Sequence, residues 1–406
     1  MTKMTLPLKK DFPALARKVN GHRLIWLDSA STTLKPLPVI QAVEEYYTNC
    51  AANVHRSIHT LGEEATAAYE GGREVVRAFL NAKSVNEIIF TAGATDSINL
   101  LATSLSRGVL NRGDTVLITQ LEHHANIVPW QMLRDYHGIN LRIAPITSDG
   151  DIDLEAFRNA MSPDVKLVAF TALSNSIGTA VPLQEMIGIV REAGAWSLID
   201  AAQAVTTISI DVQKLDCDFL VCSGHKMFGP TGIGILYGRE ALLEKLPPAR
   251  TGGDMIKSVT FEETIFNDLP AKFEAGTPNI AGAIGLAAAI HFLSEISLEA
   301  IAEHESALLA YAKSKLQEIP AVRLVGSPKR QISILSFIIE NVHPHDAGSL
   351  FNDDGIALRA GHHCTQPLMQ FFQVPATLRW SFSLYNDYSD IDEAIKSLKR
   401  IIEVFS

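Results

Sequence analysis

Short apolar runs alternate with amphipathic stretches between about residues 85 and 240. The runs are continuous and rich in branched side chains, as in strands that are buried on both faces, and they occupy residues 87–91, 115–119, 167–171, 196–200 and 219–222. Stretches such as "SINLLATSLSRGVL" and "LQEMIGIVREAG" lie between them and have helical spacing, the second ending at Gly194. This alternation predicts an α/β fold with a mainly parallel sheet sandwiched by helices.

The pattern changes after about residue 281. A long helical stretch begins there, and short strands and helices such as "ISILSFII", "ATLRWSFS" and "DIDEAIKSLKRIIEVF" follow Pro320. A chain of 406 residues is long for one domain. We predict a large domain at residues 23–290 and a smaller α+β domain formed by residues 1–22 and 291–406.

Composition narrows the class of protein. Charged residues are 20% of the chain, hydrophobic residues are 47%, and the net charge is −10, so we expect a globular protein without a nucleic-acid partner. No apolar run approaches the roughly 20 residues of a membrane span, and the first 21 residues lack an apolar signal core. We expect a soluble, cytoplasmic protein. Its four cysteines are too scattered for a disulfide framework.

Polar groups follow each predicted strand. Ligands of open parallel sheets bind at the carboxyl ends of the strands, so the coincidence of polar groups at five such ends predicts a binding site. The residues at these ends include Thr95, His123, Asn175, Asp200 with Gln203, and Ser223 with His225 and Lys226.

Lys226 lies in "SGHKMFGPTG", between two apolar runs and among glycines that allow close approach of the backbone. A partly desolvated lysine at a sheet edge has a lowered pKa and forms Schiff bases with aldehydes. Asp200 closes an apolar strand, where a protonated pyridine nitrogen would be a suitable partner. These two residues favour pyridoxal phosphate (PLP); the alternatives are a lysine snorkelling from a loop and an aspartate capping the next helix.

Other residues extend this hypothesis. The turn before Thr95 presents helix N–H groups to a phosphate, with Ser223 and His225 as further donors, unless it is an ordinary capped helix start. The His123 ring would stack on the cofactor, or it would only form a hydrogen bond.

The segment "RAGHHC" places Cys364 beside imidazoles, where a thiol has a lowered pKa and becomes a nucleophile. Arg379 is a candidate for carboxylate binding, or a surface salt-bridge residue. The histidines of "LEHHANIV" and "AGHHCTQP" allow a zinc hydrolase as an alternative, but neither has standard ligand spacing, so we predict no metal site.

Several of these segments occur together in a known family. "SGHKMFGPTGIGILYG" resembles the PLP-lysine segment of class V aminotransferase-like enzymes, which have the fold-type I PLP architecture. "LDSASTTLKP", "NVHRSIH", "EHHANIVPWQ", "AGTPN" and especially "RAGHHCTQP" resemble the group II cysteine desulfurases of the SufS type, essentially from end to end.

The resemblance implies a role for each matching residue. Lys226 would carry the cofactor, Asp200 would pair with the pyridinium nitrogen, Gln203 would contact the ring hydroxyl, and His123 would stack on the ring. Thr95, Ser223 and His225 would bind the phosphate, with Thr277 reaching it from a second subunit, so a homodimer is implied. Substrate would be held by Asn175 and Arg379, in a site lined by His55, Arg56, Arg359 and His362.

The implied reaction converts L-cysteine to L-alanine, with Lys226 moving the Cα proton and Cys364 taking the sulfur as a persulfide. The implied acceptor is a SufE-type protein that feeds the SufBCD scaffold for iron–sulfur cluster assembly, and L-selenocysteine is a further implied substrate. The sequence Cys-Thr-Gln-Pro differs from the usual Cys-Ala-Met-Pro or Cys-Ala-Gln-Pro, so a cysteine sulfinate desulfinase-type paralogue stays open. Another PLP lyase or aminotransferase on the same fold and a non-catalytic sulfur carrier are the remaining alternatives.

Overall fold

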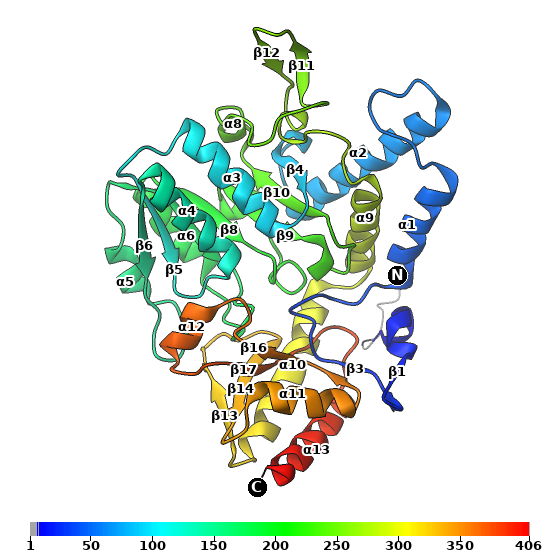
Figure 1. Cartoon of the computed structure of the whole chain (residues 1–406), viewed down its shortest axis with the longest axis vertical. Helices are drawn as coiled ribbons and strands as arrows, with labels where there is room; N and C mark the ends of the chain where they lie inside the picture. The colour runs from blue at the N-terminus through cyan, green and yellow to red at the C-terminus, as the bar shows by residue number, and fades with distance from the viewer. Residues whose placement is uncertain (1–5, 7, 406) are drawn as a thin grey trace.

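A computed structural model describes residues 6 and 8–405. A seven-stranded sheet with the order β4-β10-β9-β8-β7-β5-β6 forms the centre of the larger domain (Figure 1). Strand β10 runs antiparallel to β4 and β9, and the other neighbouring pairs are parallel. The strands are β4 (Ile88–Thr91), β5 (Thr115–Thr119), β6 (Asn140–Ala144), β7 (Val165–Thr171), β8 (Trp196–Asp200), β9 (Phe219–Ser223) and β10 (Gly234–Gly238).

Alternate side chains of these strands enter two different cores, because successive strand residues point to opposite faces. Phe170 and Leu220 pack in one core, whereas Ala169 and Phe219 pack in the other. The first core is covered by α1 (Leu37–Asn49), α2 (Thr60–Leu80), α5 (Leu154–Asn159), α6 (Leu183–Glu192), α7 (Val212–Leu215) and α9 (Ile280–Glu295). The second is covered by α3 (Ala94–Gly108), α4 (Val128–His137) and α8 (Glu240–Leu243).

The smaller domain has its own core beneath an antiparallel sheet with the order β13-β14-β17-β16. These strands are β13 (Val322–Val325), β14 (Ile334–Ile339), β16 (Arg359–Gly361) and β17 (Thr377–Ser381). Its helices are α10 (Leu298–Gln317), α11 (Pro344–Asp353), α12 (Gln366–Phe371) and α13 (Tyr388–Val404), which lie in the lower half of Figure 1.

The N-terminal segment joins the two domains. The hairpin β1 (Lys18–Val19) and β2 (His22–Arg23) precedes β3 (Ile25–Trp26), which pairs in parallel with β15 (Ile356–Ala357). Asp28 then forms a β-bridge with Ser381 of β17. Residues 25–28 therefore pack with the smaller domain, just beyond the boundary that we predicted at residue 23.

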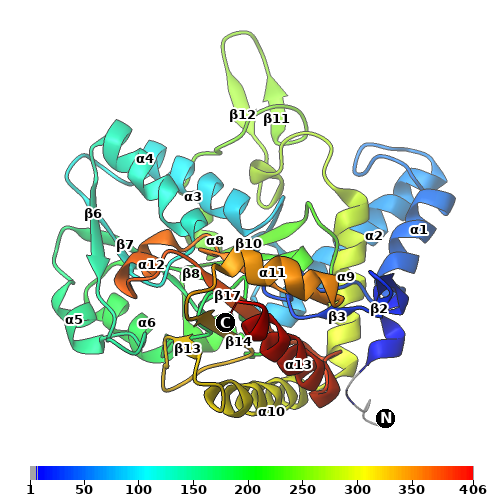
Figure 2. The same ribbon diagram turned by 60° about the horizontal axis from the view of Figure 1, so that its bottom comes forward.

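A hairpin of β11 (Ile256–Val259) and β12 (Thr264–Phe266) projects from the larger domain and is drawn at the top of Figures 1 and 2. It exposes the large apolar side chains of Val259, Phe261, Ile265 and Phe266. Among the described residues, no single helix is long and apolar enough to cross a membrane. Only α9 and α10 taken together pass by length and composition, and they are bent by 79° where they meet.

Candidate active site

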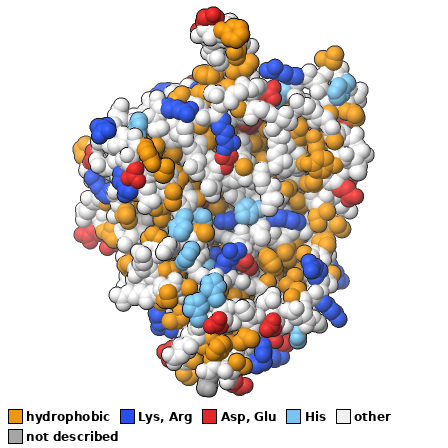
Figure 3. All heavy atoms as spheres, in the orientation of Figure 1, with side chains coloured by type: hydrophobic (Ala, Val, Ile, Leu, Met, Phe, Trp, Pro, Cys, Tyr) orange, Lys and Arg blue, Asp and Glu red, His pale blue; other side chains and the backbone are white. Residues whose placement is uncertain are grey.

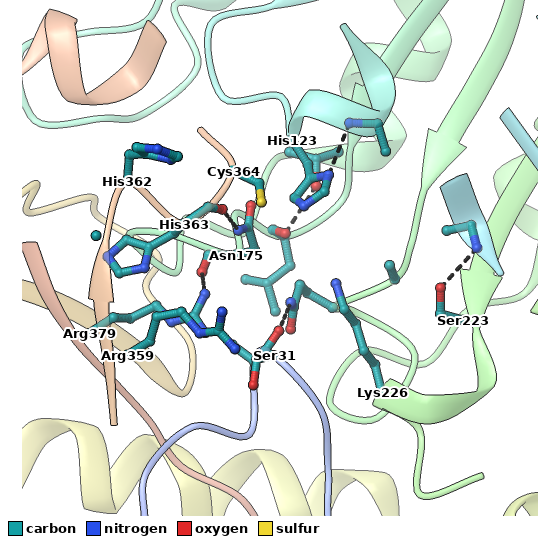
Figure 4. Close-up of a pocket in the computed structure, with 18 of the residues that line it drawn as sticks. Ser31, His123, Asn175, Ser223, Lys226, Arg359, His362, His363, Cys364 and Arg379 are labelled. Carbon is teal, nitrogen blue, oxygen red and sulfur yellow. Dashed lines mark hydrogen bonds between the residues drawn. The ribbon is translucent and has the colours of Figure 1, made fainter. Parts of the chain in front are cut away.

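A cavity of about 600 Å³ lies where the carboxyl ends of the large-sheet strands face the smaller domain. Figure 3 shows histidine, lysine and arginine side chains gathered on the face over this region, and Figure 4 shows the interior. Twelve of the predicted site residues line it: Thr95, His123, Asn175, Asp200, Gln203, Ser223, His225, Lys226, Arg359, His362, Cys364 and Arg379. Residues spread over 285 positions therefore converge, because parallel strands end at one edge of the sheet.

Lys226 ends the short 3-10 helix η5 (Gly224–Lys226), which follows β9 directly. Burial lowers the pKa of Lys226, and the charges of Arg379 and Arg359 lower it further, while Asp200 and Cys364 oppose them. Among the described residues its amine has no hydrogen-bond or salt-bridge partner. A lowered pKa favours the uncharged, nucleophilic form of the amine, as the sequence predicted.

Asp200 is the last residue of β8 and is 6% exposed. Burial raises the pKa of its carboxyl group, opposed by the N–H of Ala202, which donates to Oδ1 at 3.0 Å, and by the charge of Lys226. A buried carboxylate with one backbone donor retains lone pairs for a cationic partner in the cavity.

His123 lies between β5 and the 3-10 helix η4 (His124–Asn126), which it caps by accepting the N–H of Ala125 at Nδ1, 3.0 Å away. Burial lowers its pKa to about 3, with the charge of Lys226 as the next cause. The ring is therefore neutral, with its free Nε2 on the edge away from the cap. A neutral ring suits stacking on a cofactor better than a cation would.

Glu122, which precedes His123 and had no predicted role, is buried. Its carboxyl group accepts hydrogen bonds from the side chains of Thr119 and Asn126 and from the backbone N–H of Thr171, at 2.6–3.1 Å. Burial raises the pKa of Glu122 to about 8 despite these donors, and the charge of Asp200 adds to the rise. Glu122 thus ties the ends of β5, η4 and β7 together.

The N-terminus of α3 forms the wall near Ser223. The Ser223 hydroxyl accepts the N–H of Ala94 at 2.8 Å, and Thr95 and Asp96 follow in the first turn, where N–H groups lack an intrahelical acceptor. Nearby, burial and then the charge of Lys226 lower the pKa of His225 to about 4. Such a wall of N–H and hydroxyl donors suits an anion.

Gln203 lines the cavity on another side. Its amide nitrogen donates to the carbonyl of Ala30 at 2.6 Å. The amide oxygen is therefore directed away from that contact and remains available inside the cavity.

The smaller domain supplies two arginines that share Asp28. Arg379 of β17 is 2% exposed and contacts Asp28 at 2.9 Å, while Arg359 of β16 contacts the same carboxylate at 3.2 Å. Arg379 also donates to the carbonyl of Asn175, but its Nε has no hydrogen-bond partner among the described residues. A buried, unpaired guanidinium nitrogen at a cavity wall is a donor for a bound carboxylate.

Cys364 is exposed at the mouth of the cavity. Residues 361–366, which we name the Cys364 loop, run from the end of β16 to the start of α12. His363 and Cys364 both have left-handed backbone angles, with φ of 53° and 57°. Two consecutive non-glycine residues in this region are uncommon, and such strain is retained where other contacts impose it.

Three predicted site residues lie outside this cavity. His55 bonds to Glu70, and Arg56 pairs with Asp254. Thr277 is exposed on the segment between the 3-10 helix η6 (Ala271–Phe273) and α9. They lie beside a separate hollow lined by residues that include His55, Arg56, Gly276 and Pro278. The structure therefore groups them, but away from Lys226 of their own chain.

The histidine clusters do not converge on a metal-binding geometry in the described part of the chain, where no group of three or more His, Cys, Asp or Glu side chains could hold an ion. His343 and His345 line the cavity mouth as a stacked pair, with ring centroids 5.4 Å apart. The sequence reading gave these two histidines no role, and their i, i+2 spacing carries no signal for one.

Comparison with known proteins gives matches over nearly the whole chain. The family model described as "Aminotransferase class-V" matches residues 25–394. A "Probable cysteine desulfurase" of Halalkalibacterium halodurans is 48% identical over 398 residues, which are 98% of each chain. A "Cysteine desulfurase" of Synechococcus elongatus is 45% identical over 97% of this chain and 63% of its own longer chain.

A solved structure has the same architecture. The cysteine desulfurase CsdA from Escherichia coli superimposes with a TM-score of 0.93, at 37% identity and with 100% of both chains covered. The predicted α/β fold of the fold-type I PLP architecture is therefore confirmed.

Proposed function

Since this chain belongs to the class-V aminotransferase family, we propose that it is a PLP-dependent cysteine desulfurase that converts L-cysteine to L-alanine and keeps the sulfur on Cys364. One observation carries this proposal. The exposed thiol of Cys364, from the smaller domain, lines the same cavity as Lys226 and Asp200, from the larger domain. A PLP enzyme that does not transfer sulfur has no need of that thiol.

The residues of the cavity fit PLP. The Lys226 amine without a protein partner suits the aldehyde carbon, and the buried Asp200 carboxylate suits a protonated ring nitrogen. Thr95, Ser223 and His225, with the N-terminus of α3, suit the phosphate, and Gln203 and His123 suit the ring. When bound, PLP supplies an electron-withdrawing ring that stabilises negative charge at the substrate Cα.

The protein residues would then act on the substrate. Arg379 and Asn175 orient it through its carboxylate, with Arg359 as a second cation at the same wall. Lys226 takes the Cα proton at Nζ, and burial lowers its pKa, which favours the unprotonated form that can accept a proton.

The sulfur transfer balances without an added oxidant or reductant. The Cys364 thiolate attacks the substrate sulfur, the S–S bond forms, and the Cβ–S bond breaks. The electron pair of the broken bond stays with the carbon skeleton, which takes up protons and leaves as alanine. Cys364 carries the persulfide, and its exposure at the cavity mouth suits transfer to a second protein.

We also propose a homodimer in which His55, Arg56 and Thr277 line the partner's cavity, with Thr277 at the phosphate. Two features support it. The three residues are grouped outside their own cavity, and the segment before Thr277 is fixed by the buried contact of Glu274 with Arg73 at 2.6 Å. The segment is therefore held in place although these residues lie outside their own cavity, as expected if they serve the partner's cavity.

The remaining assignments follow the resemblance. We propose a SufE-type acceptor and the SufBCD scaffold as recipients of the sulfur for iron–sulfur cluster assembly, L-selenocysteine as a second substrate, and a cytoplasmic location. A sulfinate desulfinase-type activity can be tested with the same proteins, because only the substrate has to be changed from L-cysteine to cysteine sulfinate.

The proposal is tested by measuring alanine released from L-cysteine, with a reductant present to clear the persulfide. Wild type, Cys364→Ser, Lys226→Ala and the control Cys50→Ser are compared as PLP-loaded proteins; Cys50 lies at the end of α1 and outside the cavity. We expect alanine from wild type and Cys50→Ser, and at least 100-fold less from the other two variants (about 100-fold is the order of effect when a catalytic group is lost).

Each other outcome has a definite meaning. Equal alanine from wild type and Cys364→Ser would remove Cys364 from the mechanism, and cysteine sulfinate and selenocysteine would then be tried with the same proteins. No alanine from any protein, despite bound PLP, would contradict the desulfurase proposal while leaving the family membership intact.

A further inference from the structure

The Cys364 loop is tied to the larger domain at very few points. Among the described residues, three hydrogen bonds join residues 361–366 to that domain. One runs from the Asn175 side chain to the carbonyl of His363, at 2.7 Å. The other two both involve His124, so this residue provides most of the connection between the nucleophile and the domain that holds Lys226.

His124 contacts the loop at Cys364 itself and at Gln366, two residues further along. Its backbone N–H donates to the carbonyl of Cys364 at 2.8 Å, and its ring Nε2 accepts the N–H of Gln366 at 3.0 Å. Gln366 is the first residue of α12, so this N–H has no acceptor within its own helix. The His124 ring therefore supplies the acceptor that fixes the start of α12 against the larger domain.

The chemistry of the ring matches this contact. An imidazole accepts at Nε2 only when it is neutral with its proton on Nδ1. Burial, with the charge of His362 as a second cause, lowers the pKa of His124 below its usual value, so the ring stays neutral at pH 7. The His362 ring lies against it, with centroids 5.9 Å apart.

The two adjacent histidines thus face different partners. His123 lies in the cavity with the other large-domain residues, as Figure 4 shows. His124 instead bonds to the Cys364 loop, which comes from the smaller domain. His123 caps η4 and His124 is its first residue, so a contact between the loop and His124 lies one residue from the cavity histidine. The adjacent histidines of "EHHAN" therefore connect the cavity, through His123, with the loop, through His124.

We propose that His124 is a positioning residue that fixes the sulfur of Cys364 relative to Lys226 by accepting the N–H of Gln366. This role rests on the proposed function. The strained left-handed angles at His363 and Cys364 support it, because a loop in that conformation requires external contacts to stay there. His124 touches none of the reacting atoms in this account.

The test compares PLP-loaded wild type, His124→Ala, His124→Gln and the control His22→Ala, which removes an exposed imidazole from β2 in the smaller domain. Glutamine places an oxygen near the position of Nε2 and can accept the same N–H. Hydrogen–deuterium exchange of the Gln366 amide is measured at one pH, with alanine formation and KM for L-cysteine.

For His124→Ala we expect Gln366 exchange to rise about fivefold and alanine formation to fall by about the same factor, which is the effect of one lost neutral hydrogen bond. KM and the absorbance of bound PLP should not change, since His124 contacts neither the substrate wall nor Lys226. His124→Gln should recover most of both losses, and His22→Ala should match wild type.

Two results would overturn the proposal. The first is unchanged Gln366 exchange in His124→Ala, and the second is faster exchange with no loss of alanine formation. If wild type itself forms no alanine, the proposed function fails, and the exchange comparison alone still decides whether His124 holds the loop.

Discussion

Asp28 shows how much a single residue decides in this cavity. Its carboxylate contacts both Arg359 and Arg379. Burial lowers the pKa of Arg379 and the like charge of Arg359 lowers it further, while Asp28 opposes both effects. A third contact comes from the hydroxyl of Ser31, 2.6 Å away. Asp28 is thus the counter-charge that lets two guanidinium groups share one wall.

We predict that Asp28→Asn raises KM for L-cysteine about tenfold, because a neutral amide no longer balances the two arginines and their orientation is lost. The value of kcat should change much less, since Asp28 bonds to neither Lys226 nor the Cys364 thiol. Steady-state kinetics check this, with exposed Asp353→Asn as the control. An unchanged KM would show that the arginines hold their positions without Asp28.

Glu122 carries a pH effect with a definite sign. Its folded-state pKa, about 8, is higher than that of an unfolded glutamate, so the folded state binds the proton more tightly. The stabilisation is complete below the unfolded pKa and is lost as pH rises towards 8.

Glu122→Gln cannot ionise, and we therefore predict that its stability relative to wild type improves by about 3 kcal/mol from pH 5 to pH 8. The variant also loses some stability at every pH, because its new NH₂ group faces hydrogen-bond donors such as the Asn126 amide. Urea unfolding at several pH values, at fixed protein and PLP concentrations, measures it, with exposed Glu303→Gln as the control. Parallel curves for wild type and Glu122→Gln would contradict the prediction.

These two residues also show what a sequence does not reveal. Lys226 and Asp200 were found because Asp200 closes an apolar run and Lys226 lies a few residues after another, which is a local pattern. Asp28 meets Arg379 across 351 positions, and nothing near "LDSAS" indicates that contact. Glu122 was hidden by the adjacent histidines, although a carboxylate that follows a buried strand is the same kind of signal as Asp200.

At the scale of elements, strands β4 and β10 approach each other where the α3 turn begins. Gly234 pairs with Thr91, and a Cβ at Gly234 would lie 2.4 Å from the Cα of Gly93. Gly93 itself has φ of 152° and precedes Ala94, whose N–H reaches Ser223. Backbone atoms cannot rotate away, so a side chain at Gly234 would displace the turn.

We predict that Gly234→Ala lowers the free energy of unfolding by about 2 kcal/mol and weakens PLP binding about tenfold, through displacement of the N-terminus of α3. The control is Gly188→Ala in α6, where a Cβ meets open space and should stabilise the helix by about 0.5–1 kcal/mol. Denaturation and PLP titration of both variants check this. Equal behaviour of the two variants would contradict it.

The elements themselves were predicted well wherever periodicity is strong. The five apolar runs correspond to β4, β5, β7, β8 and β9, and "LQEMIGIVREAG" contains α6. Strand β6 was missed because its residues are mostly exposed or half-buried and form no apolar run. The antiparallel direction of β10 also lies outside the sequence pattern, since periodicity does not encode strand direction.

At the scale of the whole molecule, the predicted membership of the class-V family is confirmed, while the homodimer stays a proposal. The residues just before Thr277 are anchored by a buried, fully hydrogen-bonded contact at Glu274. Arg73 is 1% exposed and contacts Glu274, which also accepts the Tyr69 hydroxyl and the backbone N–H of Phe90. Such a buried ion pair is costly unless fully hydrogen-bonded, and here several donors satisfy the carboxylate.

This arrangement allows a complementation test with two variants. Lys226→Ala lacks the cofactor lysine, and Thr277→Ala lacks the proposed phosphate contact. If Thr277 acts on the partner's cavity, a mixed dimer has one cavity with neither residue and one cavity with both. We therefore predict that half of the sites in the mixed dimer regain wild-type affinity for PLP, whereas Thr277→Ala alone binds PLP about tenfold more weakly, the order of one hydrogen bond to a charged group.

The measurement is PLP titration of mixed dimers purified through two different affinity tags, with each parent variant titrated alongside. His291→Ala, an exposed change on α9, replaces Thr277→Ala in the control mixture, where a wild-type affinity is expected in its lysine-containing site. An affinity in the Lys226→Ala and Thr277→Ala mixture no better than that of Thr277→Ala alone would place Thr277 outside the partner's cavity. Because each mixed dimer contains a single lysine-bearing site, the result separates a contact across the dimer from one within the chain.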